Sequence, residues 1–203
     1  MTMPDGPGPG GARDGTLAQP LFFERLDGLE SWLESHHGGR AELWLKLAKK
    51  STGIESVGPD EVVDVAICFG WIDGQRRALD RDHYLQRITP RRKGSLWSLA
   101  NVRKVEALTV AGRMREPGLA EVRAAQADGR WAAAYPSQKE ATVPADLVAA
   151  LADDPGAAQR FDRLGRSARY QMVLQLLKAR TPEVRAARLA RLMAQLESGG
   201  EAG

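Results

Sequence analysis

Apolar residues near the start of the chain recur at the three- and four-residue spacing of an amphipathic helix. Within LFFERLDGLESWLESHH the recurring positions are Phe22, Phe23, Leu26, Leu29, Trp32 and Leu33. The spacing predicts one helix over this stretch, and the adjacent Gly38 and Gly39 predict its end.

The pattern then changes to strict alternation. In AELWLKLAKK, leucines at positions 43, 45 and 47 alternate with Trp44 and Lys46, which predicts a strand. The next segment, PDEVVDVAICFG, is mostly apolar. Pro59 and the two acids after it favour the start of a helix, and Gly70 favours its end. We expect this helix to be short and buried.

The segment WIDGQRRALDRDHYLQRITP predicts a β-hairpin with the polar DRDH as its turn. If the turn centres on Arg81, the period of two places alternate residues on opposite faces. One face then carries Ile72, Gly74, Ala78, Tyr84 and Ile88. The other carries Trp71, Asp73, Gln75, Arg77, Leu85, Arg87 and Thr89.

Helical patterns dominate the rest of the chain. Ser95 or Ser98 can cap a helix through LWSLANVRKVEALTVAG, and PGLAEVRAAQADG predicts a second helix that stops near Gly129. Four further helical segments follow, separated by Pro144, Pro155, Gly165 and Pro182. In the last one, Arg185, Arg188 and Arg191 lie opposite a leucine-rich stripe, which predicts a solvated basic face over a buried one.

These patterns predict an α+β fold, with a small, mostly antiparallel sheet, packed helices and a helical C-terminal section. The Gly- and Pro-rich residues 1–18 are expected to form a disordered tail. Residues 19–130 are expected to form the α+β domain. Residues 131–198 are expected to form the helical section, packed on that domain or next to it.

Charge is spread unevenly along the 203 residues, whose formal net charge is +3. Between Trp71 and Arg115 eleven Lys and Arg face only four acids, an excess of seven, so the remainder carries a net −4. A concentrated positive field favours an anionic small molecule or an acidic protein surface as partner. The alternative is a solvated basic face that only maintains solubility.

The sequence gives little support for cysteine chemistry, a metal site, a cofactor or a membrane span. Cys68, the single cysteine, lies in the apolar VAICFG, so we expect it to be a buried structural residue. The three histidines form no metal-ligand pattern and no nucleophile or phosphate-loop motif is present, so we expect no metal site and no cofactor. No apolar run in the sequence is long enough to span a membrane, and the opening residues are not expected to act as a signal peptide, because no basic segment followed by an apolar stretch is present there.

The polar face of the hairpin is the most specific candidate site. There Asp73 could hold the fork of Arg87, and nearby tryptophans could supply an aromatic wall for a planar or anionic ligand. The predicted ligand-binding residues are Trp71, Asp73, Gln75, Arg77, Arg87, Arg91, Trp97 and Asn101. The alternative is an ordinary cross-strand ion pair with both tryptophans in packing roles.

The motifs of this region resemble the bacterial YdeI/OmpD-associated family. The resemblance rests on LWLKLAKKSTG, DEVVDVAICFGWIDGQ, YLQRITPRRKGSLWSLANVRKVEAL and AGRM, and continues through GRWAAAY, VPADLVAAL and KARTPEVRAARLARLM, from about Leu21 to Leu196. It implies a link to bacteriocin protection, envelope stress and resistance to antimicrobial peptides, and it implies no particular reaction.

We therefore expect a non-enzymatic, cytoplasmic stress-resistance accessory protein that binds an anionic ligand or an acidic partner through the hairpin surface. One cysteine suits a reducing compartment. The first alternative is an enzyme acting on an anionic or planar substrate, with Asp73 as base and Arg87 or Arg91 as anion clamp. The second is weak nucleic-acid binding, with arginines neutralising the backbone and aromatic rings stacking on bases.

Overall fold

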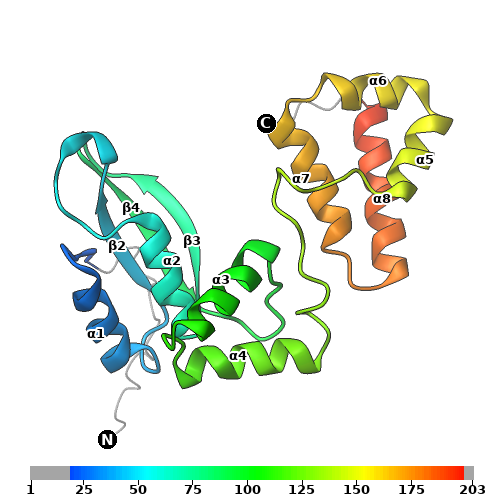
Figure 1. Ribbon diagram of the computed structural model, residues 1–203. Helices are drawn as coiled ribbons and strands as arrows, with labels where there is room; N and C mark the ends of the chain where they lie inside the picture. Colours follow the sequence, from blue (N-terminus) through cyan, green and yellow to red (C-terminus); the bar gives the residue numbers. More distant parts are fainter. Residues whose placement is uncertain (1–18, 199–203) are drawn as a thin grey trace, which may run out of the picture. The chain divides into compact units, whose positions relative to one another are not determined.

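The computed structural model describes residues 19–198 as a small sheet and a series of helices (Figure 1). The strands are β1 Leu21–Phe22, β2 Leu43–Ala48, β3 Trp71–Ala78 and β4 His83–Pro90. The helices are α1 Leu26–His36, the short 3₁₀ helix η1 Lys50–Thr52, α2 Pro59–Cys68, α3 Leu99–Val110, α4 Glu116–Ala127, α5 Ala145–Asp153, α6 Pro155–Arg163, α7 Arg166–Leu177 and α8 Pro182–Glu197. The predicted α+β class with a helical C-terminal section is confirmed. The tail expected at residues 1–18 lies outside the described residues.

The sheet has the strand order β1-β2-β4-β3. Strand β2 pairs antiparallel with β4 over six residues and parallel with the two-residue β1, so the sheet is mixed. The predicted N-terminal helix begins later than its apolar spacing indicated, because Leu21 and Phe22 pair with Leu45 and Lys46 instead of entering α1.

The register between β2 and β4 separates an apolar face from a polar face. Leu43 lies opposite Ile88, and both are buried, whereas Trp44 lies opposite Arg87 on the other face. The hairpin turn agrees with the predicted centre at Arg81, because the amide of Leu79 donates to the carbonyl of His83. Alternation thus predicted the strand faces correctly.

The turn is held by the Asp80 carboxylate. Its Oδ1 accepts hydrogen bonds from the amides of Asp82 at 2.8 Å and His83 at 2.7 Å, and it lies 3.0 Å from the His83 ring. These interactions, the Asp82 amide first, hold the pKa of Asp80 below its ordinary value. Asp80 therefore has a structural role in the turn.

Among the described residues, the chain divides into two compact units. Unit 1 contains residues 19–63 and 72–90, and unit 2 contains residues 64–71 and 91–198. The division passes through α2, so unit 1 holds the sheet, α1 and the start of α2. The predicted boundary near residue 130 remains a prediction.

Local capping decides where α3 starts. Ser98 is the N-cap, and its Oγ accepts a hydrogen bond from the Asn101 amide at 3.2 Å. Of the two serines left open by the sequence, Ser98 therefore caps the helix. Ser95 instead accepts a bond from the Arg92 amide in the preceding loop, at 3.1 Å.

Helix α4 approaches the end of α2 so closely that only glycine fits at the contact. A Cβ atom added at Gly118 would lie 2.6 Å from the carbonyl oxygen of Ile67 and closer still to that of Cys68. The Arg115 amide also donates to the Cys68 carbonyl at 3.1 Å. Cys68 is buried, so this contact is part of the interior of unit 2.

We expect Gly118→Ala to destabilise the protein by about 1 to 3 kcal/mol, because rigid backbone on both sides of the contact must move apart. Urea unfolding would measure the loss. The control is Gly39→Ala, because a Cβ atom there meets nothing within 4 Å. If both variants unfold at the wild-type urea concentration, the close approach of α4 to α2 contributes nothing to stability.

The C-terminal helices α5 to α8 share one apolar core (yellow to red in Figure 1). Its buried members are Leu147, Ala157, Phe161, Met172, Val173, Leu176, Leu192 and Leu196. Two arginines predicted to lie on a solvated face instead bind other helices. Arg185 donates to Asp146 at 2.7 and 2.9 Å and to the Leu176 carbonyl, and Arg188 donates to the Gln175 carbonyl.

The solvated-face prediction is therefore incomplete, because Arg191 is exposed whereas Arg185 and Arg188 are partly exposed and also donate to neighbouring helices. The periodicity of α8 correctly gave its buried stripe, but the neighbouring helices supply acceptors that the α8 sequence does not reveal. Hydrogen bonds from Arg185 hold the pKa of Asp146 below its ordinary value of 3.8. Asp146 thus joins α5 to α8 as a carboxylate.

This pair should make stability depend on pH in the acid range. Since folding lowers the pKa of Asp146, its contribution is fully present above the ordinary value of 3.8 and is lost as the pH falls through the lowered value. We expect Asp146→Asn to be less stable than wild type at pH 6, with the difference shrinking as the pH approaches 3. Urea unfolding across this range would measure it, with the exposed Asp153→Asn as control. A difference independent of pH would contradict the assignment.

Candidate functional site

The eight residues predicted from the sequence to bind a ligand fall into both units. Asp73, Gln75, Arg77 and Arg87 belong to unit 1, and Trp71, Arg91, Trp97 and Asn101 belong to unit 2. Each group is described within its own unit. The ligand-binding role of all eight stays a prediction.

In unit 1, Arg77 lies against an aromatic ring on the polar face of the sheet. Its guanidinium carbon is 4.9 Å from the centre of the Trp44 ring, and its Nη2 donates to Gln75 Oε1 at 3.3 Å. Trp44 is buried, with 2% of its surface exposed, whereas residues 74–78 of β3 are all exposed. Arg77 therefore presents a positive charge to solvent from a fixed aromatic support.

Arg87 is oriented by an acid that the sequence analysis did not identify. Its Nε and Nη2 atoms lie 2.7 and 2.6 Å from Glu42 Oε2, and both side chains are about 30% exposed. The predicted Asp73–Arg87 pair is wrong. The cause is the register: Trp44 lies opposite Arg87, and Glu42 lies two residues before Trp44, immediately before β2.

In unit 2, the aromatic residues have packing roles. Trp71 and Trp97 are each 1% exposed. The Arg91 guanidinium is itself buried and lies 3.5 Å from the Trp97 ring centre, and Trp97 meets the ring of Trp131 edge-on at 5.0 Å. These contacts are internal, so they give unit 2 a buried Arg–Trp cluster.

Asn101 lies in the first turn of α3, where its backbone amide donates to Ser98 Oγ. The loop before this helix is joined to the segment after α4. Arg130 donates to the Ser95 carbonyl at 2.7 Å, and the Leu99 amide donates to the Tyr135 carbonyl at 2.8 Å. The segment from Ser95 to Asn101 therefore forms the start of α3 and the connection between the two loops.

Acids from outside the positively charged segment compensate part of its charge. Lys104 pairs with Asp64 at 2.6 Å, and Arg103 pairs with Glu140 at 2.5 Å. The hydrogen bonds from Arg103 and Ser137 hold the pKa of Glu140 below its ordinary value. The excess of seven charges counted along the sequence therefore overstates the positive charge available to a partner.

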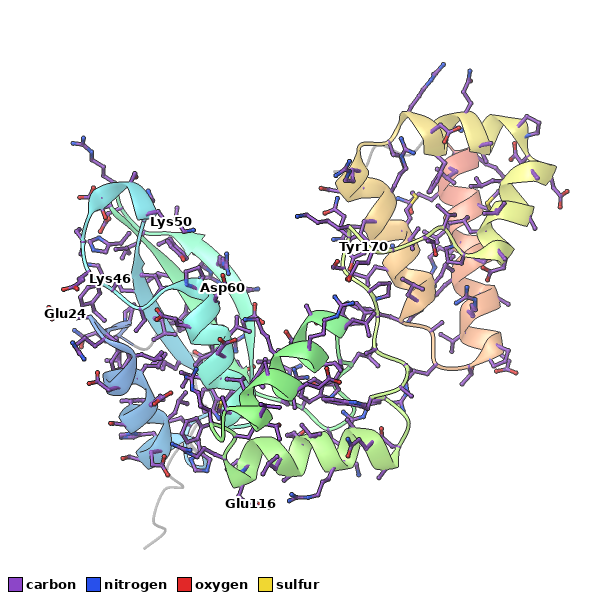
Figure 2. All side chains as sticks on the ribbon, viewed as in Figure 1. Glu24, Lys46, Lys50, Asp60, Glu116 and Tyr170 are labelled. Carbon is purple, nitrogen blue, oxygen red and sulfur yellow. The ribbon has the colours of Figure 1, made fainter. Side chains whose placement is uncertain are left out.

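The sequence analysis missed a pocket of about 350 Å³ in the C-terminal part of unit 2. It is lined by Gln138, Ala141, Val143, Arg166, Arg169, Tyr170 and Val173. Figure 2 shows Tyr170 on α7 beside the segment that leads into α5, where its hydroxyl donates to the Pro136 carbonyl at 2.9 Å. The sequence signal was the run GRSARYQM, with basic and aromatic residues at the start of a helix.

Tests for metal and membrane sites gave no candidate in residues 19–198. No cluster of three or more His, Cys, Asp or Glu in that range is arranged to hold a metal ion. In the same range no helix has the length and apolar character that a membrane span needs.

Two family models match separate parts of the chain. Residues 140–199 match the family described as Bacteriocin-protection, YdeI or OmpD-Associated. Residues 21–121 match a domain of unknown function, DUF8412. No curated protein and no solved structure gives a significant match.

The predicted family resemblance is thus confirmed as a partial match to the C-terminal part of the chain. The motifs around the hairpin, which led to the resemblance, lie inside the other matched region. The pocket beside Tyr170 lies almost entirely within the matched residues 140–199, with Gln138 just before them.

The Glu42–Arg87 pair should show measurable coupling. We expect a double-mutant cycle of Glu42→Gln and Arg87→Gln to give about 1 kcal/mol in unfolding free energy, because both groups are partly buried and closely paired. The control cycle uses Glu116→Gln and Arg123→Gln, a more exposed pair that should show no measurable coupling. Equal coupling in the two cycles would show that Glu42 does not hold Arg87 specifically.

Proposed function

We propose that this chain is a non-enzymatic accessory protein with a bacteriocin-protection or YdeI-like role, which binds an acidic segment of a partner protein through the polar face of the hairpin. The family match to residues 140–199 supports the role. The position of Arg77 on Trp44 is the observation that supports the binding face. A cytoplasmic location belongs to the proposal, as does a part in stress resistance.

Arg77 is suited to receive a carboxylate because none of its donors is used by an acid among the described residues. Its hydrogen bond goes to the neutral amide of Gln75, and its ring contact goes to Trp44. An exposed cation–π contact of this kind is worth about 0.5 to 1 kcal/mol, enough to favour one orientation of the side chain. The remaining donors can then bind a carboxylate at a small entropic cost.

Arg87 has a different part in the proposal. Two nitrogen atoms of Arg87 already contact the Glu42 carboxylate. The positive charge of Arg87 is therefore largely compensated and attracts a partner only weakly. The pair instead fixes the surface beside Trp44. The same compensation argues against Arg87 as the anion clamp of an enzyme.

The open shape of the face favours a protein segment over an enclosed small molecule. Five consecutive residues of β3, 74–78, are exposed, so a partner segment would lie along the strand. Asp73 and Gln75 precede Arg77 on the same face, and they would limit which acidic segments fit. Recognition would then depend on one arginine and its neighbours, with an affinity that falls as salt rises.

The test uses a hexaglutamate peptide as probe and isothermal titration calorimetry as readout. We expect Arg77→Ala to weaken binding about tenfold, because a charge-assisted hydrogen bond is lost. The matched control is Arg76→Ala, which removes the same charge from the neighbouring position on the opposite face of the strand. Hexaglutamine should not bind.

If Arg77→Ala and Arg76→Ala weaken hexaglutamate binding equally, the peptide is bound by general electrostatic attraction and not by the proposed face. Unchanged hexaglutamate binding in Arg77→Ala would remove this face as the site. Circular dichroism of both variants should match wild type, because neither side chain is buried. The unfolding free energy of Arg76→Ala should also match, and that of Arg77→Ala should fall by no more than the about 0.5 to 1 kcal/mol of its contact with Trp44.

A further inference from the structure

The pocket beside Tyr170 combines an apolar wall with two arginines. Ala141, Val143 and Val173 form the apolar part, and Arg166 and Arg169 form the cationic part. Its volume of about 350 Å³ is at the lower end of the range of ligand pockets, roughly 300 to 1,000 Å³. Mixed linings of this kind suit a small ligand with one polar end.

Arg169 is held in place by backbone oxygens. Its Nε donates to the Leu164 carbonyl and its Nη2 to the Asp162 carbonyl, both at 2.9 Å. The nearest acid to Arg169 is Asp162, whose carboxylate is 3.9 Å from Nη1 and whose side chain is 77% exposed. Carbonyl acceptors orient the guanidinium without cancelling its charge, and a distant, solvated carboxylate compensates it only weakly.

Arg166 adds a second positive charge at the same place. It is the first residue of α7, and its side chain is exposed, with no ion pair among the described residues. The first amides of a helix have no acceptors within the helix, and the helix dipole also favours negative charge there. Arg166, Arg169 and the helix start therefore all favour an anion at one end of the pocket.

The other end of the pocket is built into the bundle core. Val173 is buried and Ala141 packs against the same core. The Tyr170 hydroxyl is occupied by the Pro136 carbonyl, so the tyrosine contributes mainly its ring to the lining. An inorganic anion would leave this apolar part of the pocket unfilled.

We propose that this pocket binds a small organic anion, a carboxylate with a short apolar chain, with the carboxylate at Arg166 and Arg169 and the chain against Val143 and Val173. The site is separate from the hairpin face. Its ligand class does not depend on the proposed binding of an acidic partner.

The test is an NMR titration of the full-length protein with sodium hexanoate, observing backbone amide shifts. We expect saturable shifts at residues 138–143 and 166–173. 1-Hexanol carries the same chain without the charge, and sodium phosphate carries charge without the chain, so each should bind at least about tenfold more weakly.

The variant is Arg166→Gln, which should weaken hexanoate binding about tenfold. Its matched control is Arg163→Gln, an exposed arginine at the end of α6 that does not line the pocket. Arg77→Ala should leave hexanoate binding unchanged, which separates this site from the hairpin face.

Three results would overturn the proposal: shifts confined to other parts of the chain, 1-hexanol binding as tightly as hexanoate, or equal weakening by Arg166→Gln and Arg163→Gln. Saturable hexanoate shifts at the pocket that Arg166→Gln alone weakens would support it.

Discussion

The antiparallel pairing of β2 with β4 is the constraint on which the candidate binding face depends. Because Trp44 lies opposite Arg87, the alternating side chains of both strands are fixed, with Leu43, Leu45 and Leu47 on one face and Trp44 and Arg87 on the other. The same register brings Glu42 to Arg87 and leaves Trp44 where Arg77 can cover it. A shift of one residue would exchange the two faces and separate these groups.

Ion pairs within the protein decide which arginine and lysine side chains remain available to an anionic partner. Along the sequence, the segment from Trp71 to Arg115 is strongly positive. In the structure, Arg87, Arg103 and Lys104 each pair with an acid from outside that segment, and Arg91 is buried against Trp97. Binding capacity therefore concentrates at a few arginines that neutral groups orient, such as Arg77 and Arg169.

The sequence predicted features that depend on local signals. The hairpin, its turn, the buried Cys68 and a serine cap at Ser95 or Ser98 all depend on residues within a few positions of each other, and the structure then selects Ser98 as the cap. It could not predict β1, since two residues are too few to show a period. Nor could it give the partners of Arg87 and Arg185, because Glu42 and Asp146 lie 45 and 39 positions away and only tertiary packing brings them close.

In the candidate sites, too, the sequence predicted what depends on local patterns and missed what depends on long-range packing. Alternation gave the polar face of the hairpin correctly, including the shared side of Gln75 and Arg77. The burial of Trp44 and Trp97 depends on long-range packing and was not predictable from a strand or loop pattern. The pocket beside Tyr170 joins residues about thirty positions apart, so no single motif could show it.

We propose above that the face formed by β2, β3 and β4 binds acidic protein segments. Backbone amide shifts of the wild-type protein, mapped during titration with hexaglutamate, test it most directly. We expect saturable shifts centred on residues 42–46 and 73–78, together with the indole N–H of Trp44. Shifts spread over all exposed arginines and lysines, or centred in unit 2, would contradict it.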